Sequence, residues 1–263
     1  MAASLLRPMG PSRPQPIDRT RTMSESPPLI DPGTRKQRLR QARDSAAVTL
    51  ARLQTQHPTA HCELDHSSPF ELLVAVVLSA QTTDVAVNKA TPRLFARYPD
   101  APAMAKATPQ EIEPFVASLG FFRAKSKAIV GLARSLVTLH RGNVPRSLDA
   151  LIQLPGVGRK TANVVLGVAF GCPAGIVVDT HVSRVSQRLG WTRQTDPTRI
   201  ESDISQLFSA DLWDRASHTI VIHGRRCCEA RNPRCSECSV NDLCPSAFDA
   251  VRIGRKRPTL RTK

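Results

Sequence analysis

The apolar positions of this chain recur mostly three or four residues apart, which is the spacing of a helix face packed against a core. Ala46, Ala47, Leu50 and Leu53 follow this spacing and predict a helix over about 35–56. No stretch shows the strict alternation of apolar and polar residues that a half-buried strand requires. The pattern therefore favours a helical protein.

Two capping boxes mark further helix starts. In such a box a hydroxyl before the helix accepts a backbone N–H, and a glutamate three residues later accepts the N–H of the capping residue. The boxes are Ser68-Pro69-Phe70-Glu71, before a helix predicted over about 70–80, and Thr108-Pro109-Gln110-Glu111. Further helices are predicted over about 123–140, 148–154, 160–170 and 181–189, from 196, and over 211–223. About ten helices predict an all-α fold.

The segment Leu154-Pro-Gly-Val-Gly-Arg-Lys160 reads as a two-glycine hairpin between two helices. We expect Gly156 and Gly158 to adopt backbone angles that are closed to other residues and to leave main-chain N–H groups unobstructed. Such donors at the start of a helix favour an anion, for example a phosphate. A nucleotide-binding loop is disfavoured, because that motif needs glycines where Arg159 and Leu154 stand.

Composition adds a strong positive charge to this picture. The 263 residues carry a formal net charge of +15, and aromatic residues make up only 4% of the chain, with a single tyrosine. The charge favours a polyanionic partner such as nucleic acid. The scarcity of aromatic residues argues against a module that stacks several bases on an aromatic sheet. No apolar run reaches the length needed to span a membrane.

Both ends of the chain read as tails. Residues 1–34 are rich in proline and arginine and offer little to bury, so they predict a disordered basic segment. Residues 248–263 contain six basic residues and one acidic residue, and they predict a basic C-terminal tail.

Five of the seven cysteines lie within residues 227–244. Cys228, Cys235, Cys238 and Cys244 have the spacing C-x6-C-x2-C-x5-C, and thiolates so close in sequence can converge on one metal centre. Zinc is the generic alternative, but zinc ribbons and fingers use two C-x2-C pairs, whereas only one occurs here. Cys227 is extra to the pattern.

Lys160 and Asp179 are the candidate catalytic residues. A lysine at the start of a helix is electrostatically unusual, and the helix dipole together with partial burial would favour a neutral, nucleophilic amine. The alternative is a surface lysine that contacts phosphate. Asp179 precedes the helix predicted over 181–189, so it can equally be an N-cap.

Three motifs together resemble the endonuclease III family of helix-hairpin-helix DNA glycosylases: the Leu154–Lys160 hairpin, Val178-Asp179-Thr180-His181 and the four cysteines. The resemblance covers about 40–247, roughly four-fifths of the chain. It implies two helical lobes flanking a cleft for DNA. Residues 62–172 would form a six-helix lobe with the hairpin, and residues 35–61 with 173–247 would form a lobe that holds a 4Fe-4S cluster on the four cysteines.

The activity implied by the resemblance is that of a bifunctional DNA glycosylase and abasic-site lyase that removes oxidised pyrimidines in base excision repair. Lys160 would form a Schiff base with the sugar, and Asp179 would assist. One departure is the spacing of these two residues, which is nineteen here against eighteen in the family. The alternatives are an adenine-mismatch glycosylase and a non-catalytic DNA-binding protein that uses the hairpin alone.

The resemblance also implies which residues bind DNA. Gln81 would fill the hole left by the displaced nucleotide, and Phe121 would act as a wedge. Their alternatives are a polar residue at a helix end and a core aromatic. The implied DNA-binding set is Gln81, Phe121, Leu154, Gly156, Val157, Gly158, Arg159, Arg231 and Arg234. The partner would be double-stranded DNA that contains damaged bases or abasic sites. We expect a monomer that acts in a bacterial cytoplasm on the nucleoid, or in a nucleus or organelle if the source is eukaryotic.

Overall fold

The computed structural model describes residues 32–253, and within them the chain forms helices and no strands. The all-α prediction is therefore confirmed. The α-helices are α1 (Pro32–Gln56), α2 (Pro69–Leu78), α3 (Asp84–Arg97), α4 (Ala101–Ala105), α5 (Pro109–Val116), α6 (Phe122–His140), α7 (Leu148–Ile152), α8 (Arg159–Phe170), α9 (Thr180–Arg188), α10 (Pro197–Ser205) and α11 (Trp213–Arg226). Short 3-10 helices span Ala210–Leu212, Cys235–Glu237 and Ala250–Arg252.

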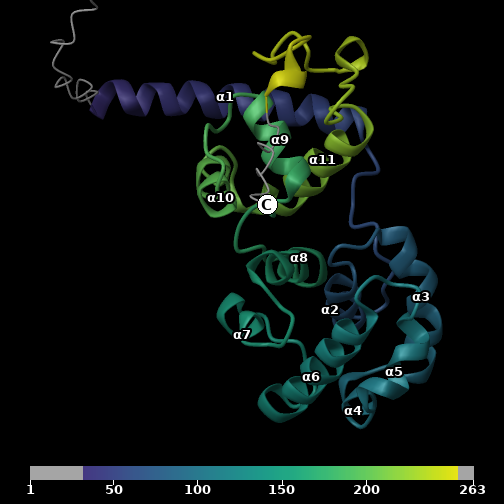
Figure 1. Cartoon of the computed structure of the whole chain (residues 1–263). Helices are drawn as coiled ribbons and strands as arrows, with labels where there is room; N and C mark the ends of the chain where they lie inside the picture. Colours follow the sequence, from purple (N-terminus) through teal and green to yellow (C-terminus); the bar gives the residue numbers. More distant parts are fainter. Residues whose placement is uncertain (1–31, 254–263) are drawn as a thin grey trace, which may run out of the picture.

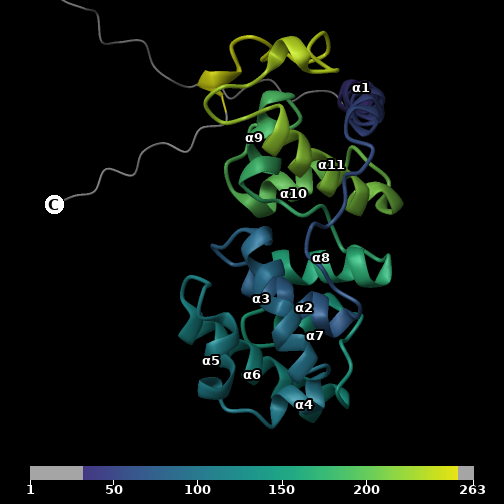
Figure 2. The same ribbon diagram turned by 90° about the vertical axis from the view of Figure 1, so that its right-hand side faces the viewer.

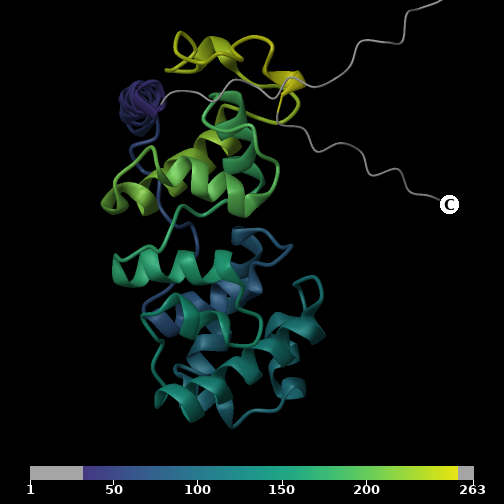
Figure 3. The same ribbon diagram turned by 90° about the vertical axis from the view of Figure 1, so that its left-hand side faces the viewer.

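The helices gather in two groups, each around its own apolar core (Figures 1, 2 and 3). The central group consists of α2–α8 and buries residues such as Leu72, Leu94 and Leu132. The terminal group consists of α1, α9–α11 and the C-terminal segment, and it buries residues such as Leu50 and Ile220. Helix α1 therefore lies far in sequence from its partner α11, against which it packs.

Helix starts follow the predicted capping chemistry. Thr108 forms a complete capping box, since its hydroxyl accepts the Glu111 N–H at 3.3 Å and the Glu111 carboxylate accepts the Thr108 N–H at 2.7 Å. Ser68 accepts the Glu71 N–H at 3.2 Å, but the Glu71 carboxylate accepts from Ser67 rather than from Ser68. In the Ser68 box the bond from the backbone to the glutamate therefore comes from the residue before the cap.

Two helices were missed by the apolar pattern. Helix α3 contains Pro92, a residue that normally breaks a helix, and α4 is only five residues long. Both start on side-chain caps: the Thr83 hydroxyl accepts from Ala86, and the Asp100 carboxylate accepts from Ala103. A single capping residue without the glutamate of a capping box was the signal for these two helix starts, and the apolar pattern does not show it.

The predicted tails are shorter than expected at both inner ends. Helix α1 begins at Pro32, within the segment predicted as a tail up to residue 34. At the other end Ala250 is 2% exposed, and the Ile253 carbonyl accepts a hydrogen bond from Arg188. Residues 248–253 therefore belong to the folded protein. The rest of both tails lies outside the described residues. No described helix is long and apolar enough to cross a membrane.

Candidate functional site

The hairpin between α7 and α8 is anchored in the central core. The side chains of Leu154 and Val157 are 2% and 6% exposed, and the Val157 N–H donates to the Leu154 carbonyl at 3.1 Å. These two residues therefore fix the turn, and the segment can offer DNA its main chain rather than these side chains.

The two glycines have different conformational roles. Gly156 has φ +78°, and an added Cβ would lie 3.3 Å from Ala128 and Val77. Gly158 has φ −93°, so the expectation of a restricted backbone angle is wrong there. An added Cβ at Gly158 would meet nothing within 4 Å, so its outer face is open to a partner. Within the described chain, the N–H groups of both glycines donate to no backbone acceptor.

Lys160 and Asp179 come together although they lie nineteen positions apart in the sequence. Both line two cavities: one with Asp84 and Arg225, here called the Asp84 cavity, and one with Arg231, here called the Arg231 cavity. Lys160 is exposed, so the expected partial burial is wrong. The arrangement places an amine and a carboxylate on the same accessible space.

Asp179 is the N-cap of α9. Its Oδ1 accepts the N–H groups of His181 and Val182, each at 2.8 Å. The other carboxylate oxygen, Oδ2, accepts no hydrogen bond within the described residues. One oxygen thus holds the helix start while the second remains available for chemistry.

An ion-pair network that sequence reasoning missed joins the two helical groups beside this pair. Arg225 of α11 bonds Asp84 of α3 at 3.0 Å and also bonds Glu63, and Arg226 bonds Glu63 at 3.2 Å. Asp84 and Arg225 line the Asp84 cavity with Lys160. The sequence hinted at this network only through Asp84, which lies three positions after the candidate DNA-binding residue Gln81.

Arg159 forms a second bridge between the groups. Its guanidinium bonds both carboxylate oxygens of Glu201, at 2.9 and 3.1 Å. Hydrogen bonding to Glu201 raises the pKa of Arg159, so this pair is a firm contact between α8 and α10. Half of the Arg159 side chain remains exposed.

Gln81 and Phe121 stand out by their backbone conformation. Gln81 has φ +55° and Phe121 has φ +58°, the left-handed region that is unfavourable for such residues. Gln81 is exposed, and Phe121 is 70% exposed, so Phe121 is not a core aromatic. An exposed aromatic ring held in an unfavourable conformation points to a partner rather than to packing.

Arg231 and Arg234 lie between Cys228 and Cys235, in the segment here called the ligand loop, and they differ in their contacts. Arg231 is exposed and lines the Arg231 cavity with Lys160 and Asp179. Arg234 turns back on its own loop, where it pairs with Glu229 and Glu237 at 3.5 Å and bonds the Arg226 carbonyl. The geometry therefore favours Arg231 over Arg234 as a DNA contact.

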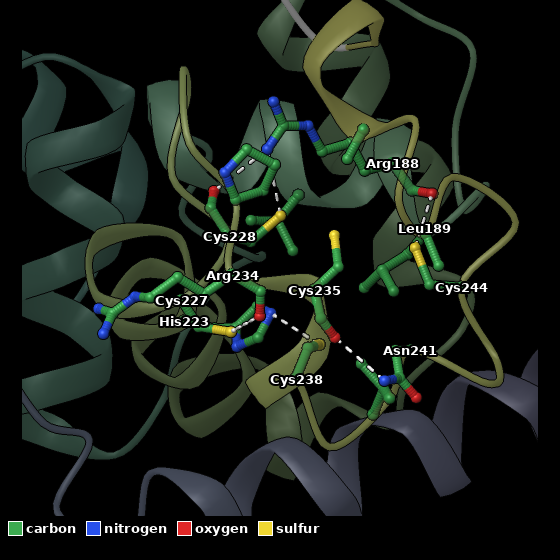
Figure 4. Close-up of a pocket in the computed structure, with 15 residues that line it drawn as sticks. Arg188, Leu189, His223, Cys227, Cys228, Arg234, Cys235, Cys238, Asn241 and Cys244 are labelled. Atoms are coloured by element: carbon green, nitrogen blue, oxygen red, sulfur yellow. Dashed lines mark hydrogen bonds between the residues drawn. The ribbon is translucent and has the colours of Figure 1, made fainter.

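The cysteines near the C-terminus surround one apolar cavity (Figure 4). The cavity is lined by Cys227, Cys228, Cys235, Cys238 and Cys244, together with residues such as Val185 and Val240. Thiolate sulfur is the ligand that iron–sulfur clusters use, and an apolar wall suits such a group. The donor set therefore fits a cluster.

A buried arginine and a histidine pair hold the ligand loop. Arg188 is fully buried and bonds the carbonyls of Cys228, Glu229, Ala230 and Ile253. Burial alone would raise the pKa of Cys228, but hydrogen bonds from His223 and Arg188 hold it below its usual value, which favours the thiolate. His223 in turn lies 3.0 Å from the ring of His57.

Cys227 is the ambiguous member of this cluster of thiols. Cys227, Cys238 and His223 bring their ligand atoms within 4.8 Å of one another, which would suit a small ion. However, only Cys228 gives the spacing C-x6-C-x2-C-x5-C, whereas Cys227 would make the first gap seven residues. We therefore retain Cys228 in the set of four.

Comparisons with known proteins agree with this geometry. Residues 74–210 match the profile described as HhH-GPD superfamily base excision DNA repair protein, and residues 228–244 match the iron-sulfur binding domain of endonuclease III. The second match starts at Cys228 and ends at Cys244.

Similar proteins cover most of the chain. Endonuclease III of Synechocystis is 53% identical over 202 residues, covering 77% of this chain and 92% of that protein. A solved non-covalent endonuclease III–DNA complex has a TM-score of 0.75 at 42% identity, covering 80% of this chain and 98% of that one. A trapped endonuclease III–DNA covalent intermediate has a TM-score of 0.74 at 42% identity, covering 79% and 97%.

Proposed function

The chain belongs to the endonuclease III family of the HhH-GPD superfamily, and we propose that Lys160 and Asp179 are its catalytic pair. The protein is a DNA glycosylase and abasic-site lyase of base excision repair. One observation carries the choice of residues: an amine and a carboxylate from the starts of two helices, α8 and α9, line the same two cavities.

The proposed reaction uses Lys160 as the nucleophile. Its amine attacks C1′ of the damaged nucleotide, and the base leaves with the electron pair of its glycosidic bond. Opening of the sugar ring gives a protonated imine, loss of a C2′ proton then expels the 3′ phosphate, and water releases the enzyme. This sequence is the β-elimination that cuts the strand 3′ to the lesion.

Asp179 has the geometry for two tasks at once. Oδ1 is fixed by the α9 cap, and this fixes the direction of Oδ2. The free oxygen can accept a proton from Lys160 and stabilise the positive charge that develops on the sugar, as a carboxylate does in glycoside hydrolysis.

DNA binding is proposed for the hairpin, for Gln81, Phe121 and for Arg231. The open N–H groups of Gly156 and Gly158 suit a phosphate. Gln81 and Phe121 are exposed on the two unfavourable turns and can enter the stack when the nucleotide leaves it. Arg159 is assigned to joining the helical groups through Glu201, with its exposed half free to face DNA.

The 4Fe-4S cluster is held by Cys228, Cys235, Cys238 and Cys244 in this proposal. When bound, the cluster cross-links the C-terminal segment to itself, and no step of the reaction passes through it. Arg188 orders the carbonyls around the first ligand, and Arg231 lies in the loop that the cluster closes. The site thereby carries one DNA-contact residue.

The substrate and setting complete the proposal. We infer oxidised pyrimidines as the damaged bases, and residues 62–172 and 35–61 with 173–247 as the two lobes. We infer that the protein acts as a monomer. Because the similar proteins are bacterial, we also infer that it acts in the cytoplasm on the nucleoid.

Borohydride trapping tests the Schiff base. The wild-type protein should form a covalent adduct with DNA that contains an abasic site, and Lys160→Gln should form none while still binding a stable abasic analogue. Lys106→Gln, a change at an exposed lysine at the end of α4, is the control and should trap normally. Adducts of wild-type yield in Lys160→Gln would reject Lys160 as the nucleophile.

Asp179→Asn separates capping from chemistry. Asparagine keeps an oxygen that can cap α9, so the melting temperature should change little while base release slows by about 100-fold or more. Asp196→Asn is matched, because Asp196 caps α10 in the same way at 3.0 Å but lines neither cavity. If both variants lost stability alike and Asp179→Asn kept its rate, Asp179 would be a cap only.

A further inference from the structure

Lys125 is a buried lysine that the reaction above does not use. It lies in the first turn of α6 and is 6% exposed. Its ammonium donates a short hydrogen bond to the Thr82 hydroxyl. It forms no ion pair within the described chain, and burial lowers its pKa.

Such a residue is not explained by stability. A buried cation without a carboxylate keeps part of its desolvation cost, and the Thr82 hydroxyl is the one side-chain acceptor that it bonds within the described residues. The start of a helix is also the end where positive charge is least favourable. An apolar residue of the same length, such as methionine, would suit the position better. Some other requirement must favour lysine there.

The contacts of Lys125 reach both unfavourable turns. Its backbone N–H donates to the Phe121 carbonyl at 3.0 Å, and its side chain bonds Thr82, the residue next to Gln81. The Thr82 N–H donates to the Ser79 carbonyl at 3.0 Å, so Thr82 is part of the turn that holds Gln81. Lys125 thus contacts the Phe121 main chain through its own N–H and the residue after Gln81 through its side chain.

The backbone conformations of the two turns need a stabilising contact from outside each turn. Gln81 and Phe121 each occupy the left-handed region, which costs about 1–2 kcal/mol for a residue with a Cβ atom. The start of α6 has no side-chain cap that could fix the Phe121 turn. A charge-assisted hydrogen bond between the turns supplies a hold that weak surface contacts would not.

We propose that Lys125 is a positioning residue that fixes the Gln81 and Phe121 turns relative to each other, so that both side chains enter the duplex as one unit. The proposal rests on the DNA glycosylase function proposed above. Its effect belongs to the step in which a nucleotide leaves a paired stack. A substrate that is already unpaired at that point should not depend on the Lys125–Thr82 bond.

The test compares two substrates across four variants. One substrate is a fully paired duplex with an oxidised thymine, and the other carries an abasic site inside an unpaired bubble. The variants are Lys125→Met, Thr82→Val, the double variant and Lys127→Met, the last being a change at an exposed lysine of the same helix. Single-turnover base release is measured on the duplex, and borohydride trapping is measured on the bubble.

Each single variant should slow base release from the duplex by about tenfold, the scale of one hydrogen bond to a charged group. The double variant should be no slower than the slower single variant, because both changes remove the same bond. Trapping on the bubble should stay near the wild-type yield in all variants, and Lys127→Met should match the wild type on both substrates.

Three outcomes would overturn the proposal. The single variants could release the base from the duplex at the wild-type rate, or the double variant could be slowed by the product of the two single effects. Trapping on the bubble could also fall as much as base release on the duplex. Thermal melting of each variant separates misfolding from positioning, since Lys125→Met should not lower the melting temperature if the lysine is costly. If the wild-type protein itself neither released the base from the duplex nor trapped on the bubble, the proposed function would fail instead.

Discussion

The central and terminal groups are held together by different interactions. The central core consists of 29 buried apolar residues, and Lys125 is the one buried charged side chain described there. The terminal core has 11 such residues, and around it lie buried Arg184, Arg188, His57 and His223. The central group is therefore stabilised mainly by burial of apolar surface, which is non-directional. The terminal group relies on hydrogen bonds and on a metal centre, which specify positions.

The difference matches the role proposed for each group. The hairpin and the two turns at Gln81 and Phe121 belong to the central group. The ligand loop with Arg231 depends on Arg188 and the cysteines for its shape. A small apolar core can thus present a long irregular loop only if directional contacts hold that loop.

Loss of the cluster should have the largest effect on folding, and it should separate the terminal group from the central group most clearly. Cys235→Ser should remove the cluster, loosen the terminal group and leave the central group folded, because only the terminal core depends on it. Hydrogen exchange followed by mass spectrometry should show loss of protection at α9, α11 and 227–253, with α2 and α6 unchanged.

Cys227→Ser is the control for this experiment, since Cys227 directly precedes Cys228, the first residue of the proposed ligand set. It should retain iron and the broad visible absorption of a cluster. Equal loss of iron in both variants would move Cys227 into the ligand set, and zinc without iron in the anaerobically purified protein would reject the cluster.

Arg188→Met should have the next largest effect. The change leaves the carbonyls of Glu229, Ala230 and Ile253 without their donor inside the protein, so we expect a loss of about 3–5 kcal/mol in the free energy of unfolding. Denaturant titration would measure it.

The matched arginine of the central group is Arg134, which bonds the Ala105 and Ala107 carbonyls from an exposed position. Arg134→Met should cost less than about 1 kcal/mol, because water can replace an exposed donor. Equal costs for the two arginines would contradict the idea that only the terminal group depends on a buried arginine for its stability.

The smallest expected effect concerns pH and His57. Burial, together with the neighbouring His223 and Arg226, lowers the pKa of His57 to about 4 from an ordinary 6.5. Between these values the unfolded chain binds a proton that the folded chain does not, so His57 makes stability fall as pH falls from 6.5 toward 4. His57→Asn should flatten this part of the stability–pH curve, and exposed His61→Asn should not. The same slope in both variants would assign the acid sensitivity to other groups.

Local spacing made part of this structure predictable. The hairpin, the caps and the four cysteines are encoded within short segments, so their chemistry is visible in the sequence. The Gly158 angle and the burial of Lys160 were wrong, because both depend on how the turn sits in the fold rather than on residue type. The ends of the tails were misplaced for a similar reason: Ile253 is ordered through distant Arg188.

What stayed hidden depends on partners far apart in the chain. Arg159 meets Glu201 across 42 positions, and Lys125 meets Thr82 across 43. The family resemblance placed Arg159 in the DNA-binding set, and no local pattern singled out Lys125. Only the fold reveals that one arginine joins two helical groups and that one lysine joins two turns.

The pairing of α1 with α11 has a consequence for synthesis on the ribosome. Leu50 and Ile220 share one core although 170 positions separate them, and the whole central group is inserted between them. The central group can fold as soon as it emerges, whereas the apolar face of α1 must wait until nearly the entire chain has been made. During that interval Ala46 and Leu50 are exposed to the cell, and iron can be loaded only at the end. Slow cluster supply should therefore lengthen the time in which the nascent protein needs a chaperone.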